Sequence, residues 1–214
     1  MESNWASENL QVIRTLMERS ALYRRALGPI MMATGIIGLA GAGIAWTVKT
    51  TTPAAFTEYW TVVCALAIAT SFVIARRQAI KQSEPLWTPP AKRVALALAA
   101  PLFAGAAMTA PLTFVTKDDL YLNYAMIIVS AWLAFYGCGL HSAGFFISRG
   151  VKVLGGIFIL CGAMIFFILP AMVNSTAPAH QNFVPHAVMG LTFGGLHLAS
   201  GIYLYFTENR DHAA

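Results

Sequence analysis

The sequence predicts an all-α protein: a polytopic bundle of six transmembrane helices, preceded by an amphipathic helix at the membrane surface. Three observations predict this fold. Charged residues make up 11% of the 214 residues, against about 25% in soluble domains. Apolar residues make up 57%, and they gather in six long runs. The basic residues lie mostly between these runs. So little polar surface cannot cover a globule in water, and lipid is therefore the expected solvent for most of the chain.

Residues 1–25 are predicted to form a cytoplasmic or interfacial amphipathic helix, from Ser7 to about Tyr23. Ser7 suits the N-cap, and Glu8 is favourable in the first turn. Apolar side chains recur at helical spacing, at Leu10, Ile13, Leu16 and Met17. The helix either docks a cytoplasmic protein partner or lies on the inner leaflet with its arginines on anionic headgroups. The second role is preferred. Because acidic residues stand where a signal peptide is basic, we expect the first span to be retained.

Six segments are long and apolar enough to cross a hydrocarbon core, which needs roughly 20 predominantly apolar residues. They form a predicted membrane domain over residues 26–207, followed by a cytoplasmic tail over 208–214. The second span is short, and a tight hairpin over residues 116–119 separates the third from the fourth. The six predicted spans cover residues 27–48, 59–75, 94–115, 121–146, 153–173 and 184–206.

The basic residues predict the orientation of these spans. Of the 14 Lys and Arg residues, all except Lys49 and Lys117 fall on the side of the bundle that carries the two termini. Cytoplasmic loops are enriched in Lys and Arg. Both termini are therefore expected in the cytoplasm.

The prolines predict breaks in the helices. The segment 76–93 is expected to be the one sizeable cytoplasmic loop, because Pro85, Pro89 and Pro90 exclude a continuous helix. Trp87 has the character of an interfacial anchor. In the third span, Pro101 and Pro111 each remove a backbone hydrogen bond and are expected to kink the helix.

Small residues recur at steps of three or four along several spans, which keeps them on one helix face. Close packing of helices in lipid depends on such faces. We therefore expect the glycines on them to contact other helices rather than lipid. The predicted packing glycines are Gly38, Gly137, Gly144, Gly190 and Gly194.

Three histidines in the spans, His141, His186 and His197, are the candidates for ligand binding or proton handling. His141 and His197 are expected at similar depth in the cytoplasmic half, on faces that point into the bundle. Hydrogen bonding to neighbouring helices is the preferred interpretation. The alternatives are a proton relay or ligand site, since polar residues in spans are often functional, and ligation of haem b between His141 and His197.

Other motifs of catalysis or metal binding are missing from the sequence. There is no GxGxxG, Walker A, HExxH or GxSxG in its required context. Each of the three cysteines sits alone in an apolar run, so neither a disulfide framework nor a zinc site is indicated.

Two stretches resemble a family of small uncharacterised bacterial membrane proteins. The first is residues 10–20, LQVIRTLMERS, which lead into a Gly/Ala-rich span. The second is Gly194-Gly195-Leu196-His197 with the following GIYLYF. The resemblance implies a six-helix protein of the bacterial inner membrane, often encoded beside a winged-helix transcriptional regulator, with no activity to carry over. Of the three histidines, only His197 falls on a matching position.

These observations predict a non-catalytic sensory, regulatory or assembly component that acts through partners. The lipid bilayer and a protein at the cytoplasmic face are the expected partners, a homo-oligomer is left open, and nucleic acid is not expected because the basic residues are scattered. One alternative is a haem-binding redox anchor. Another is a small transporter or channel, which predicts a water-accessible cavity near the midplane, lined by His141 or His197 with Ser130, Ser142 or Ser200.

Overall fold

The computed structural model describes residues 26–48, 50–83, 85–114, 121–175 and 180–210. The predicted amphipathic helix over residues 1–25 and the predicted hairpin over 116–119 lie outside the described residues. The end of the predicted tail, residues 211–214, does so as well.

Six helices are long and apolar enough to cross a membrane, and the described residues form no β-strand. The first span covers Ala26–Ala45. The third span is continued by the 3₁₀-helix η1, and the sixth span is built of α6, the π-helix η4 and α7. The remaining elements are α2 (Pro53–Lys81), α3 (Pro89–Thr109), η1 (Ala110–Phe114), α4 (Tyr121–Ala143), α5 (Arg149–Ser175), α6 (Val184–Met189), η4 (Gly190–Gly195) and α7 (Leu196–Arg210). The all-helical fold class with six apolar helices is thereby confirmed.

The second span and the loop after it differ from the prediction. Helix α2 continues through Arg76 and Arg77 to Lys81, so the predicted loop over 76–93 is wrong in its first part. Its last part is helical too, because Pro89 and Pro90 open α3 behind the N-cap Thr88. A proline in the first helical turn loses no hydrogen bond, since that N–H has no partner within the helix. Residues 82–83 and 85–88 are not helical, so the prediction that the prolines exclude a continuous helix is confirmed, but Pro89 and Pro90 mark a helix start rather than a loop.

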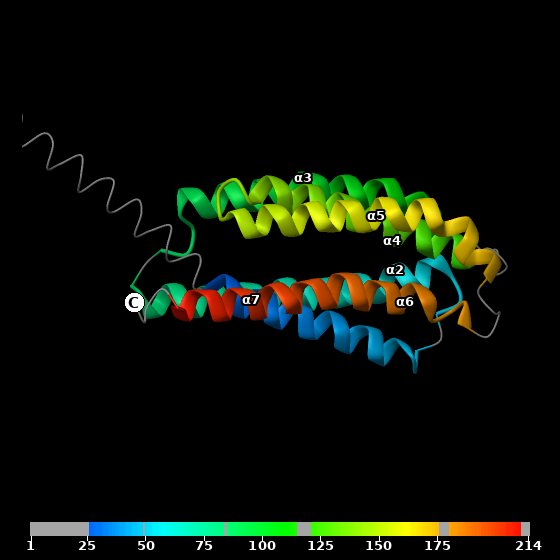
Figure 1. Cartoon of the computed structure of the whole chain (residues 1–214), viewed down its shortest axis with the longest axis horizontal. Coiled ribbons are helices and arrows are strands. Elements are labelled where there is room, and N and C mark those ends of the chain that lie inside the picture. Colours follow the sequence, from blue (N-terminus) through cyan, green and yellow to red (C-terminus); the bar gives the residue numbers. More distant parts are fainter. Residues whose placement is uncertain (1–25, 49, 84, 115–120, 176–179, 211–214) are drawn as a thin grey trace, which may run out of the picture.

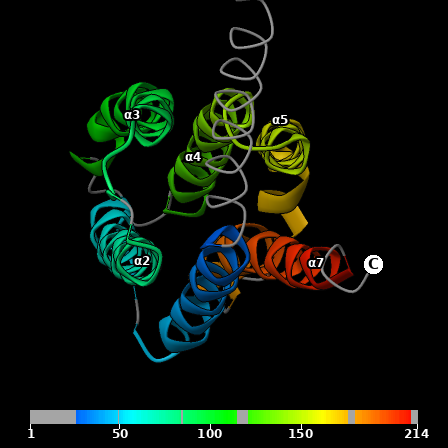
Figure 2. The same ribbon diagram turned by 90° about the vertical axis from the view of Figure 1, so that its left-hand side faces the viewer.

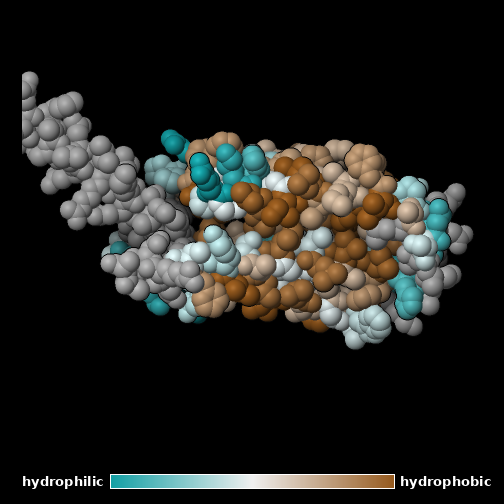
Figure 3. Space-filling view, viewed as in Figure 1, coloured by the Kyte–Doolittle hydropathy of each residue, from teal (hydrophilic) through white to brown (hydrophobic). Residues whose placement is uncertain are grey.

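The six spans form two groups of three, which are seen side by side in Figures 1 and 2. Helix α4 packs along α3 and α5; we call these three the α4 group. The α7 group consists of the first span, α2 and the α6–η4–α7 helix. We call the end at which the first span begins and α7 ends the proximal end, and the opposite end the distal end. On the face shown in Figure 3, apolar residues form a broad band between these two ends.

Glycines bring the helices of each group close together. In the α4 group, a Cβ atom on Gly137 would lie 2.7 Å from the carbonyl oxygen of Gly155, and one on Gly144 would lie 2.8 Å from the Cα atom of Lys152. Both glycines are buried. The backbones of α4 and α5 therefore approach more closely than any side chain at these positions would allow.

The same kind of contact joins the first span to the sixth. A Cβ atom on Gly38 would lie 2.9 Å from the Cα atom of Gly194, and one on Gly190 would collide with Ala42. Gly38, Gly190 and Gly194 are all buried. The small-residue faces thus lie where helix packing in lipid requires them.

The buried core is concentrated toward the distal end. The buried residues of α2 run from Pro53 to Ala67, and Ala79 is the sole buried residue in its remaining turns. Phe56 is 0% exposed, whereas Phe72 on the same helix is 51% exposed. The two groups are therefore packed against each other at the distal end and share less buried surface at the proximal end.

Candidate functional site

His186 lies in α6 at the distal end, inside a chain of polar side chains. The indole N–H of Trp60 donates to its Nδ1 atom over 3.0 Å. Because indole is only a donor, Nδ1 must accept, and the neutral ring then carries its proton on Nε2. That N–H donates to Thr50 Oγ1 at 2.6 Å. Both ring nitrogens are therefore used within the protein.

The series of hydrogen-bonded side chains continues from Thr50 into the α4 group. The Thr50 hydroxyl lies 3.0 Å from the Tyr121 hydroxyl, which donates to the Asn182 carbonyl over 3.5 Å. His186 is 1% exposed, and the rings of Phe56 and Tyr59 pack around it. A charged His186 would turn a second N–H toward the indole N–H of Trp60. This arrangement suits a neutral imidazole that joins the two groups.

His197 is the second residue of α7, which follows the π-helix directly, and it is likewise 1% exposed. The Phe193 carbonyl lies 2.7 Å from its Nδ1 atom. Since a carbonyl only accepts, Nδ1 carries the proton, and Nε2 accepts from the Tyr136 hydroxyl at 2.6 Å. Tyr136 belongs to α4, so this bond is a second link between the groups. The ring of Phe158 completes the enclosure, with its centroid 5.2 Å from that of His197.

His141 serves a different contact. Its Nδ1 atom lies 3.1 Å from the Lys152 carbonyl, to which it donates, and it is half-buried where α4 meets α5. Tyr136 precedes it by five residues, a rotation of about 140° on an α-helix. His141 therefore faces α5, whereas Tyr136 faces His197. Among the described residues, no hydrogen bond or ring contact joins His141 to His197.

The histidine pair that was considered for haem b does not fit an iron in this arrangement. An iron ligated by His197 would have to replace either the Phe193 carbonyl or the Tyr136 hydroxyl. Within the described part of the chain, no group of three or more His, Cys, Asp or Glu side chains is placed to hold a metal ion.

Four polar residues of these clusters were not identified from the sequence: Thr50, Trp60, Tyr121 and Tyr136. Each lies in a span or at the end of one, and nothing in its local sequence distinguishes it. Its role depends on the hydrogen-bond partner that another segment of the chain brings next to it. Trp60 and Tyr136 are 126 and 61 residues from His186 and His197, so no sequence signal pairs them.

A groove of about 430 Å³ lies between the two groups. It is lined by α5 between Gly150 and Ile157, by α7 between Leu196 and Leu204, and by Met31 of the first span. Among its lining side chains, Ser200 and Tyr203 are the two that carry a polar atom, and neither His141 nor His197 lines it. This groove therefore differs from the cavity that the transport hypothesis predicts, because its lining is almost entirely apolar and includes no histidine.

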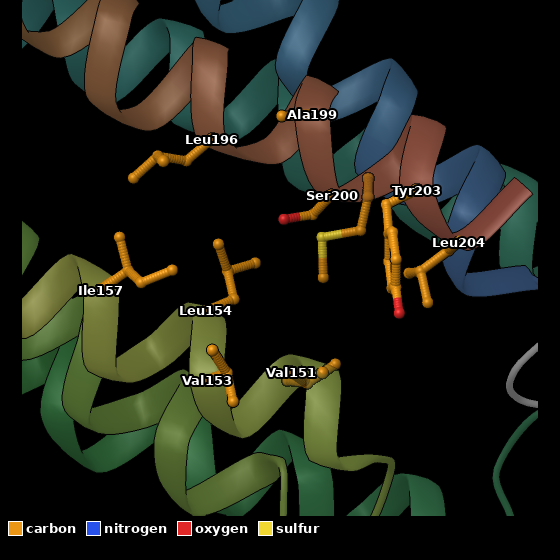
Figure 4. A pocket seen from close by; sticks show the side chains of 11 residues that line it. Val151, Val153, Leu154, Ile157, Leu196, Ala199, Ser200, Tyr203 and Leu204 are labelled. Carbon is orange, nitrogen blue, oxygen red and sulfur yellow. The ribbon is translucent and has the colours of Figure 1, made fainter. Parts of the chain in front are cut away.

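The Ser200 hydroxyl projects into the space between α5 and α7 (Figure 4). Two threonines of the same span donate to carbonyls four residues earlier: Thr192 to Val188 and Thr207 to Tyr203. No hydrogen bond to another described residue holds the Ser200 hydroxyl. Within the described part of the chain it is therefore an unpaired polar group in an apolar groove.

No protein-family model, curated protein or solved structure matches this chain.

Proposed function

We propose that this protein is a non-catalytic membrane component with a sensory, regulatory or assembly role, which acts through a protein partner at its proximal face. The observation that carries the proposal is that both buried histidines have both ring nitrogens hydrogen-bonded within the bundle. Their geometry suits links between helices rather than reaction with a substrate. The polar side chains that remain available to bind a partner are therefore those at the surface.

The proximal face carries the charge for such an interaction. Arg76, Arg77 and Lys81 end α2, and Lys92 and Arg93 lie in the first turn of α3. All five are exposed. Clustered cations bind acidic surfaces and raise association rates. The partner is therefore expected to offer an acidic surface.

By the positive-inside rule, we propose that the proximal end, which carries these cations, lies in the cytoplasm of a bacterial inner membrane. A fluorescent protein fused after residue 214 should then fluoresce, and alkaline phosphatase fused at the same point should be inactive. The opposite pair of results would reverse the orientation and move the proposed partner to the other side.

Photo-crosslinking in native membranes tests the partner itself. A benzophenone side chain in place of Arg77 or Lys92 should give one discrete adduct. The same probe at Phe114, which is 82% exposed at the distal end, should give none. The change R76E should abolish the Lys92 adduct. Equal adducts at both ends, or a purified chain that turns over a substrate, would contradict the proposal.

Transport is the second candidate, and the groove between the two groups is the observation that favours it. The apolar lining argues against a polar solute, because a permeating ion needs oxygen or charged ligands along its path. Liposomes containing the purified protein should leak protons and potassium no faster than empty liposomes. A flux that I157W, a substitution in the groove lining, abolishes would establish transport and displace the first candidate.

A further inference from the structure

We infer that the groove between α5 and α7 is a binding site for one anionic phospholipid, with an acyl chain along the groove and the headgroup at its proximal mouth. This site is separate from the partner surface proposed above. Its volume of about 430 Å³ falls within the roughly 300–1,000 Å³ of typical ligand sites. Three features of the groove select this occupant.

The first feature is the lining. Val151, Leu154 and Ile157 of α5 face Leu196 and Leu204 of α7 across the groove (Figure 4). Both walls belong to helices that are long and apolar enough to cross a membrane, so in a bilayer the groove would border hydrocarbon rather than bulk water. An acyl chain matches an apolar site in this position, and its burial needs no desolvated polar group.

The second feature is the unpaired hydroxyl of Ser200. Seven residues separate Ser200 from Thr207 at the proximal end of the span, a rise of about 10 Å. At this depth water does not satisfy a polar group, and an unpaired one is unfavourable. A lipid ester carbonyl is an acceptor that an acyl chain in the groove would bring to this hydroxyl. The Tyr203 hydroxyl, on the same wall, offers a second donor.

The third feature is the charge at the mouth. Gly150 lines the groove between the cations Arg149 and Lys152, and Arg149 is exposed. Lys152 packs against Gly144 at the end of α4, with its Nζ atom 3.9 Å from the ring centroid of Phe145, which leaves Arg149 as the exposed cation next to Gly150. Leu204, on the opposite wall, lies about 6 Å closer to the proximal end than Ser200. That separation accommodates the glycerol and phosphate of a lipid whose ester group is at Ser200.

Native mass spectrometry of the full-length protein in detergent tests the site. Phosphatidylglycerol and phosphatidylcholine with palmitoyl and oleoyl chains are added in parallel. The wild type should bind one phosphatidylglycerol in preference to phosphatidylcholine. The variant I157W fills the groove and should lose this lipid. The matched control is L160W, because Leu160 is 64% exposed on the same helix and lies outside the groove; this variant should keep the lipid.

Two milder variants test the polar contacts, with thermal unfolding as a check that each is folded. S200A should weaken binding of both lipids about threefold, the equivalent of the average hydrogen bond in a membrane protein. R149Q should weaken phosphatidylglycerol about fivefold, since each cation near an anionic lipid surface contributes about 1 kcal/mol, and should leave phosphatidylcholine unchanged. The control R77Q should alter neither.

Three outcomes would overturn the inference. Equal binding of phosphatidylglycerol by I157W and L160W would place the lipid elsewhere. Equal binding of both lipids by the wild type would remove the role of Arg149. A dimer that I157W dissociates would show that a second copy of the chain fills the groove. None of these outcomes bears on the crosslinks expected at Arg77 and Lys92, so the two proposals fail independently.

Discussion

The distal and proximal halves of this bundle are built from the same helices but are packed in different ways. In the distal half, the two groups meet over buried aromatic rings and through the chain Trp60–His186–Thr50–Tyr121. In the proximal half, a groove separates α5 from α7, and Ile80 and Leu96 are 67% and 72% exposed. Buried packing and the hydrogen bonds around His186 therefore lie at the distal end, and the groove lies at the proximal end.

A physical reason underlies this division. Lipid tails are as apolar as leucine, so apolar surface alone does not hold helices together in a membrane. Close backbone contacts and hydrogen bonds between helices must do so. Hydrogen bonds reach α4 at the Thr50–Tyr121 pair, next to His186, and at the Tyr136–His197 pair, which is the more proximal of the two. Beyond His197 the groups share few such contacts, and a groove remains.

The largest expected effect comes from removing the same side chain in each half. F56A deletes a ring that is 0% exposed and should lower the free energy of unfolding by about 3–5 kcal/mol. F72A, 16 residues further along α2, deletes a ring that is 51% exposed and should change it by less than about 0.5 kcal/mol. Unfolding in mixed micelles by SDS measures both. Similar losses for the two variants would erase the distinction between the halves.

An intermediate effect is expected at the helix contacts within a group. G137L should cost about 1–3 kcal/mol by overpacking, because the backbone of α5 occupies the space that the new side chain needs. Gly156 is the control, since a Cβ atom there would meet nothing within 4 Å. G156L should therefore unfold like the wild type. If both leucine variants are equally stable, Gly137 is not a packing residue.

The smallest effect is expected at the bond between the groups at mid-span. Y136F removes the donor to Nε2 of His197 and leaves a buried acceptor unpaired, which should cost about 1 kcal/mol. Y205F removes a hydroxyl from a side chain that is 52% exposed and should be neutral. The same SDS unfolding measures the pair, and hydrogen exchange of the α7 amides should be faster in Y136F alone. Unchanged exchange in Y136F would mean that this bond does not hold α7.

Several features followed from the sequence because they depend on local chemistry. Span length and apolar composition predicted six membrane helices, and the periodic glycines predicted where helices approach, as at Gly137 and Gly194. Both signals arise from residues a few positions apart. The helix start at Pro89 and Pro90 is local as well, since it depends on the capping residue Thr88 directly before them.

Only the tertiary structure determined which partners the polar residues have. The sequence favoured hydrogen bonding for the three histidines, but it did not reveal that Trp60 and Tyr136 would be the partners of His186 and His197. It placed His141 near His197, although the two point to different helices. Ser200 was expected beside a histidine and instead stands in an apolar groove. The partner of a buried polar group is set by the rotation of a helix that is distant in sequence. Periodicity fixes which residues share a face, but the fold decides what that face meets.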